Sequence, residues 1–194
     1  PGGGQVKRPS DNAEPRKIAW IQCVGSRDAG IGREYCSSIC CMQATKQAII
    51  AREHDPRVEA TIFFLDMRAQ GKGFDRYYER AREVSRVRYI RSLVSRVTQD
   101  PRTQNLEITY MDGDNHVQTE TFDLVILSVG LVSRPATRDL AAMCGIATNR
   151  WGFAESPPFE LVATDQPGIF ACGAFQSPKD IPETVVQASA AAAA

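Results

Sequence analysis

The 194-residue sequence has no excess of charge, no long apolar run and very little histidine. Lys and Arg number 23, as do Asp and Glu, so no net field attracts nucleic acid or an anionic membrane. Apolar runs such as FDLVILSVGLV are far shorter than the roughly 18–20 residues that a membrane span needs. The two histidines lie in turn-like surroundings. The sequence therefore offers no visible group of acid, base and nucleophile for substrate chemistry.

No charged segment followed by an apolar segment opens the chain, so we expect a cytoplasmic protein. Residues 1–16 are rich in Gly, Pro and charge, and we interpret them as a linker or an expression remnant. The sequence starts without Met and stops at QASAAAA, inside an expected helix, so we expect a fragment of a longer protein. Six cysteines without a secretory signal favour metal ligands or redox groups over a disulfide framework.

The expected elements alternate between strand and helix in the first half of the chain. They are strands at 17–23, 59–66 and 87–90 and helices at 36–53 and 74–84. This order predicts a doubly wound parallel sheet with right-handed crossovers. Residues 93–123 alternate with period two in three runs, which predicts a three-stranded antiparallel meander. We expect buried strands at 124–130 and 168–173, and then a terminal helix.

Four of the six cysteines follow the pattern C-x12-C-x3-C-C between residues 23 and 41. If Cys36 lies in the first turn of the helix, Cys40 follows one turn later on the same face, and Cys41 is rotated by about 100°. Cys23 can reach them from the end of the preceding strand. The helix N-terminus favours thiolates there. The spacing matches neither separate CxxC zinc knuckles nor the ferredoxin CxxCxxC run, so a [4Fe–4S] cluster, zinc and redox-active or buried thiols all stay open.

A nicotinamide-binding loop is not expected between the first strand and the first helix. The stretch GIGREY has two glycines but lacks the third glycine of G-x-G-x-x-G, and Arg-Glu-Tyr stands where the helix should begin. The first glycine-rich motif for FAD is absent as well. We therefore expect no NAD(P) site on this loop, and we expect its glycines to serve turns.

Three long blocks resemble a known family. The meander, followed by FDLVILSVGLVSRP and GIFACGAFQSPKDIPETVVQASAAA, resembles the flavoproteins of the thioredoxin reductase type. With the cysteine block and FLDMRAQGKGFDRYYERA, the chain is similar to the A subunit of heterodisulfide reductase and its relatives, from about Lys17 to the last residue. The resemblance implies an α/β fold with a Rossmann-like unit at 17–130. It also implies that 131–194 form the returning C-terminal part of an FAD-binding domain.

The resemblance implies a [4Fe–4S] cluster and, in the longer parent protein, FAD. The implied cluster ligands are Cys23, Cys36, Cys40 and Cys41. Lys46, five residues beyond Cys41, would direct a cation toward the flavin or the cluster.

The implied flavin contacts lie near the end of the chain. The second FAD motif of the broader flavoprotein group ends in Gly-Asp, and here Gly173 is followed by Ala174, so a carboxylate contact is in doubt. Backbone N–H groups from Thr184 through Val185 to Gln187 would face the isoalloxazine ring and stabilise its anionic reduced form.

The implied function is electron transfer between flavin, cluster and partner subunits, the partners being other heterodisulfide reductase-type subunits or iron–sulfur carriers. We expect this fragment alone to be unable to turn over. One alternative is an NAD(P)H-dependent disulfide reductase domain whose redox dithiol is Cys40 and Cys41. Another is an interaction module stapled by zinc.

Overall fold

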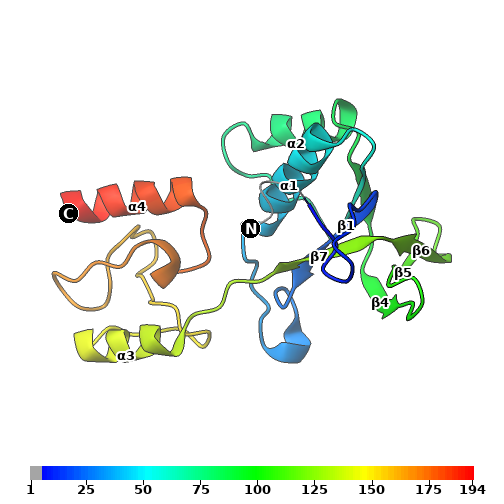
Figure 1. Ribbon diagram of the computed structural model, residues 1–194. Helices are drawn as coiled ribbons and strands as arrows, with labels where there is room; N and C mark the ends of the chain where they lie inside the picture. The colour runs from blue at the N-terminus through cyan, green and yellow to red at the C-terminus, as the bar shows by residue number, and fades with distance from the viewer. Residues whose placement is uncertain (1–5) are drawn as a thin grey trace. The chain divides into compact units, whose positions relative to one another are not determined.

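A computed structural model of the chain describes residues 6–194 and divides them into two compact units (Figure 1). Unit 1 contains the residues up to Val24 and residues 40–129. Unit 2 contains residues 25–39 and 130–194. The chain therefore leaves unit 1 at the end of the first strand, returns at the first long helix, and leaves again after the last strand.

Unit 1 is built on a four-stranded parallel sheet. Its strands, in the order β3-β2-β1-β7, are Arg88–Arg91, Glu59–Phe64, Lys17–Val24 and Leu124–Val129. Helix α1 (Cys40–His54) connects β1 to β2, and helix α2 (Phe74–Glu83) connects β2 to β3. Parallel neighbours need such crossover helices, and a helix that leaves a strand begins at the strand's carboxyl end. The predicted α/β fold and its parallel sheet are confirmed.

The two faces of the sheet carry two separate cores. On one face, Ile18 and Trp20 of β1 pack with Ala44 and Ala48 of α1. The other face packs against the predicted antiparallel meander, which consists of β4 (Val94–Gln99), β5 (Leu106–Met111) and β6 (Val117–Phe122). Figure 1 shows α1 and α2 together on one side of the sheet and the meander on the other. Alternate residues of β1 thus point to helices and to meander, as the period of a strand requires.

A half-buried carboxylate joins the meander to the parallel sheet. Glu120 on β6 accepts hydrogen bonds from Arg88 on β3, at 2.9 Å, and from Lys17 on β1, at 2.7 Å. Burial raises the pKa of Glu120, but the hydrogen bonds from Arg88 and Lys17 outweigh it and lower the pKa to about 2. The sequence alternation predicts the strands of the meander but gives no sign of this three-residue contact.

Unit 2 contains two helices, α3 (Pro135–Cys144) and α4 (Ile181–Ala193), and two short 3-10 turns at Ala29–Ile31 and Gly173–Phe175. The strand expected at 168–173 is wrong: the segment forms a single bridge, between Phe170 and Ala163. Two glycines with positive φ, Gly168 and Gly173, bracket it, and no continuous ladder partner lies beside it in the described chain. A strand needs such a ladder to satisfy its backbone groups.

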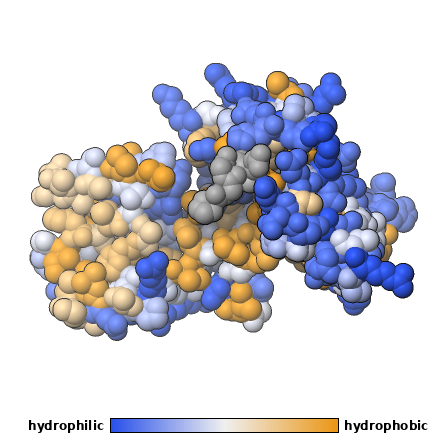
Figure 2. Space-filling view, in the orientation of Figure 1, coloured by the Kyte–Doolittle hydropathy of each residue, from blue (hydrophilic) through white to orange (hydrophobic). Residues whose placement is uncertain are grey.

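Much of the surface of unit 2 is apolar. Ile181, Val185 and Val186 on α4 are 80, 59 and 61% exposed, and Met143 on α3 is exposed as well. Figure 2 shows hydrophobic and small apolar residues over α4 and α3. Within residues 6–194, no helix has both the length and the apolar character needed to cross a membrane.

Candidate functional site

The last residues of β1 depart from a regular strand. Ile21 pairs with Leu127 and Val24 with Val129, so two residues of β1, Gln22 and Cys23, stand opposite the single residue Ser128 of β7. Cys23 has a φ of 60°, in the left-handed region that side chains rarely adopt. Such a bulge re-aims the side chains that it contains. In unbroken alternation Cys23 would share the meander face with Ala19 and Ile21, and the bulge takes it out of that alternation.

Helix α1 begins at Cys40, so the expectation that Cys36 lies in its first turn is wrong. Ser38 has a φ of 62°, and the amide of Ile39 donates to Ser37 O at 2.7 Å. This turn prevents the helix from extending back to Cys36. Cys40 and Cys41 are both buried in the first helical turn, where the direction of the backbone N–H groups and the helix dipole favour sulfur anions.

Two hydrogen bonds fix the position of α1 on the sheet. Nε1 of Trp20 on β1 donates to Oε1 of Gln47 at 3.0 Å, and the hydroxyls of Thr45 and Tyr89 lie 3.0 Å apart. Burial is the main reason why the pKa of Tyr89 rises to about 12. These two contacts bond α1 to β1 and to β3.

From this anchor, β1 and α1 reach the same level of the sheet. Cys23 lies three residues beyond Trp20, which is about 10 Å along a strand. Cys41 lies six residues before Gln47, which is about 9 Å along a helix. The helix runs antiparallel to the strand, so both distances lead to the carboxyl edge of the sheet. The thiol of Cys41 also donates to Asp66 O, just beyond β2, at 3.8 Å.

Cys36 belongs to unit 2 and is separated from Cys40 by three residues. Its Sγ accepts a hydrogen bond from the amide of Ser38 at 3.3 Å. An N–H group directed at sulfur stabilises negative charge on it.

The glycine-containing loop before α1 is closed by contacts within unit 2. Gly32 has a φ of 67°, ends the first 3-10 turn, and offers its carbonyl to Nε1 of Trp151 at 3.0 Å. The hydroxyl of Tyr35 donates to Leu131 O at 2.8 Å, and the Tyr35 ring packs edge-on against Trp151. The glycine therefore serves a turn, as its sequence context predicts.

The residues predicted to face flavin surround the start of α4. The amide of Gly173 donates to Oε1 of the buried Gln187 at 2.8 Å, and a Cβ on Gly173 would come within 2.8 Å of Cγ2 of Thr184. Ala174 and Val185 are exposed. Gln187 is itself buried in unit 2, and its side-chain oxygen accepts a hydrogen bond from the protein's own backbone.

A capping box closes the N-terminus of α4. The amide of Glu183 donates to the Asp180 carboxylate at 2.8 Å, and the amide of Thr184 donates to Asp180 O at 3.1 Å. Two amides near the expected flavin-facing end are thus already satisfied by the N-cap residue. Lys46, the other predicted contact, is exposed on α1.

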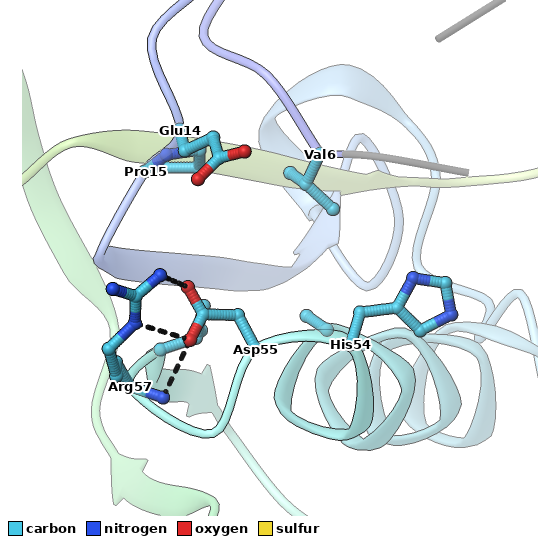
Figure 3. Close-up of a pocket in the computed structure, with 8 residues that line it drawn as sticks. Val6, Glu14, Pro15, His54, Asp55 and Arg57 are labelled. Carbon is cyan, nitrogen blue, oxygen red and sulfur yellow. Dashed lines mark hydrogen bonds and ion pairs between the residues drawn. The ribbon is translucent and has the colours of Figure 1, made fainter. Parts of the chain in front are cut away.

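A separate pocket of unit 1 lies at the other end of α1. It has a volume of about 480 Å³ and is lined by Val6, Glu14, Pro15, Ala51, His54, Asp55, Arg57 and Val58. In Figure 3, Asp55 and Arg57 face each other while His54 points away from them. The Arg57 side chain donates to both carboxylate oxygens of Asp55, at 2.8 and 2.9 Å, and these bonds lower the pKa of Asp55 to about 2. None of the predicted site residues lines this pocket.

Comparison with solved structures identifies the class of fold. Thioredoxin reductase of T. acidophilum superposes with a TM-score of 0.57 at 17% identity over 91% of this chain and 50% of that chain. LpdA of Mycobacterium tuberculosis gives 0.52 at 17% identity over 91% and 33%. At this identity the likeness shows the fold alone, which is that of the thioredoxin reductase-like α/β proteins.

Sequence relatives identify the family. The iron-sulfur A subunit of CoB–CoM heterodisulfide reductase from Methanocaldococcus jannaschii is 44% identical over 198 residues, covering 100% of this chain and 30% of the relative. The A subunit of the H2/formate:CoB–CoM heterodisulfide, ferredoxin reductase of Methanococcus maripaludis is 42% identical over the same shares. No family model matches the chain. Along its whole length, the chain is related to the A subunit of heterodisulfide reductase, of which it spans about 30%, and the resemblance seen in the sequence is confirmed.

Proposed function

We propose that this chain is an electron-transfer part of a flavin and iron–sulfur oxidoreductase, of the type to which the A subunit of heterodisulfide reductase belongs. In this proposal, Cys23, Cys36, Cys40 and Cys41 hold a [4Fe–4S] cluster. The bound cluster supplies one-electron transfer beside the two-electron chemistry of FAD. The donors and acceptors are other subunits of such a complex or iron–sulfur carriers.

The observation that carries the proposal is the common level of Cys23 and Cys41 at the carboxyl edge of the sheet of unit 1. The Trp20–Gln47 contact sets that level, the bulge takes Cys23 out of the regular alternation of β1, and the Cys41 thiol bonds to Asp66 O just beyond β2. This edge is where proteins with open parallel sheets bind their ligands. Four cysteine thiolates are the ordinary donor set for a [4Fe–4S] cluster, and the first turn of α1 favours their negative charge.

The flavin part of the proposal assigns residues 131–194 to the C-terminal segment of an FAD-binding domain. Its support is the relationship to much longer relatives, together with the exposed apolar side chains of α4. Gly173, Ala174 and the turn of α4 from Thr184 through Val185 to Gln187 would then lie beside the isoalloxazine ring. Lys46 would contribute a cation near flavin or cluster. Residues 17–130 would keep the fold of a nucleotide-binding domain with the cluster in place of the nucleotide.

Analysis of bound metal tests the cluster. We expect anaerobically reconstituted protein to contain about four irons and four sulfides per chain, with broad absorbance near 400 nm. Cys40→Ser should lose both. Cys144→Ser is the matched control, because Cys144 packs at the edge of the core of unit 2, and it should retain them.

Two other results would each assign a different function. One bound zinc without colour would identify a zinc-stapled interaction module. Protein that stays metal-free after reconstitution, with a Cys40–Cys41 disulfide that NADPH reduces to the dithiol, would identify the disulfide reductase.

A further inference from the structure

Gln22 is a buried amide without a protein partner. Its side chain is on a residue only 7% exposed, and neither Nε2 nor Oε1 finds a hydrogen-bond partner among residues 6–194. Leaving a buried amide unpaired costs free energy, so buried polar groups are nearly always bonded to protein, water or a ligand. An amide that stays buried without a protein partner points to a group that is bound there.

Gln22 lies on the α1 face of the sheet. Ile18 and Trp20 of β1 pack in the core that α1 covers, and Gln22 is the next residue in the same alternation. It also shares the bulge with Cys23, opposite Ser128. The unpaired amide is thus covalently adjacent to a cysteine of the proposed site, on the face where α1 begins.

The anchor at Trp20 places Gln22 below the first turns of α1. Gln22 lies two residues beyond Trp20, about 7 Å along the strand. The same distance back from Gln47 along α1 leads to between Met42 and Gln43, within one turn of Cys40 and Cys41. The amide therefore lies just beneath the level of the three cysteines of unit 1.

We propose that Nε2 of Gln22 donates a hydrogen bond to a sulfur of the group held by these cysteines and thereby raises its reduction potential. This inference rests on the proposed cluster function. A one-electron reduction adds negative charge to the cluster sulfurs, and an N–H donor stabilises that charge more than it stabilises the oxidised form. Gln22 is thus a positioning and tuning residue that ligates no iron.

The test compares Gln22→Leu with Gln43→Leu in the reconstituted 194-residue chain. We expect Gln22→Leu to keep its iron and sulfide. Its midpoint potential, from a redox titration followed by electron paramagnetic resonance, should fall by the equivalent of about tenfold in the reduction equilibrium, or about 59 mV for one electron. Gln43→Leu makes the same chemical change at an exposed position of α1 and should leave the potential unchanged.

A second measurement separates tuning from a structural role. In metal-free protein, Gln22→Leu should be at least as stable as wild type, because an unpaired amide gives way to an apolar side chain of similar size. Lower stability of this metal-free variant would show that the protein itself bonds the amide, and would overturn the inference.

The results also separate this inference from the proposed function. Wild type that binds four irons, with Gln22→Leu titrating at the same potential, would overturn only the role of Gln22. Wild type that takes up no iron would overturn both.

Discussion

The indole Nε1 of Trp20 donates a hydrogen bond of 3.0 Å to Oε1 of Gln47, and this contact sets how far α1 is shifted along β1. Trp20 is nearly fully buried, whereas Gln47 reaches it from the exposed side of the helix. Because Cys23 and Cys41 lie at similar distances from this contact, their common level at the edge of the sheet depends on it. Sliding the helix by one turn would move Cys41 about 5 Å from that level.

Loss of this contact should weaken the fold. We expect Gln47→Leu to lower the free energy of unfolding of metal-free protein by about 1 kcal/mol, because the buried indole N–H loses its acceptor. Chemical denaturation measures the change. Gln43→Leu, at an exposed position one turn earlier on α1, is the control and should have little effect. Equal stabilities for Gln47→Leu and wild type would show that water replaces the amide.

The backbone of Cys23 should make glycine favourable in the middle of a strand. The φ of 60° costs a residue with a side chain about 1–2 kcal/mol. Metal-free Cys23→Gly should therefore be more stable than Cys23→Ala by about 1 kcal/mol, although neither should bind iron. The control is Ala19→Gly in the regular part of β1, which should destabilise the protein. A Cys23→Gly variant less stable than Cys23→Ala would contradict the strained bulge.

Glu120 should make the stability of unit 1 depend on pH in the acid range. Its folded pKa of about 2 lies below the ordinary value of 4.5, so its contribution is fully present above about pH 4.5 and is lost as the pH falls toward 2. At pH 7, Glu120→Gln should be less stable than wild type by about 1–2 kcal/mol, and the difference should shrink toward zero near pH 2. Denaturant titrations across this range measure it. Glu107→Gln, on the exposed side of β5, should show no such convergence.

Gln187 should stabilise unit 2 through its buried amide. The side chain accepts from Gly173 N at 2.8 Å and donates to Leu161 O at 3.3 Å. Gln187→Leu leaves the buried Gly173 N–H unpaired, whereas Leu161 O keeps its hydrogen bond from Gln176 Nε2, and the change should cost about 1–2 kcal/mol of unfolding free energy. Ser189→Ala, on the exposed face of α4, should change it little. If Gln187→Leu had the same unfolding free energy as wild type, the turn at Gly173 would not depend on this side chain.

The pattern of apolar and polar residues along the sequence predicts most strands and helices of the fold. Continuous apolar runs predict β1, β2 and β7, because a parallel strand covered on both faces has to be apolar throughout. Period-two alternation predicts the meander, and the helix expected to end at residue 53 ends at His54. The long blocks around the cysteines predict the family, which the relatives confirm.

The errors fall where tertiary contacts override local preference. The helix was expected from Cys36 because its apolar spacing starts there, but the left-handed Ser38 delays it to Cys40. The segment 168–173 has the composition of a strand, yet a strand depends on a partner that its own residues cannot specify. Gln22 was missed because sequence alone does not show which polar residue of a strand becomes buried without a partner.

By itself, the sequence determined the type and order of the elements and the set of four cysteines, because both are properties of neighbouring residues. Only the tertiary structure decided how those residues meet. The strand bulge at Gln22 and Cys23, the alignment of α1 by Trp20 and Gln47, and the carboxylate of Glu120 between two strands all join segments far apart in the chain. Such contacts depend on packing and register, which local preferences do not encode.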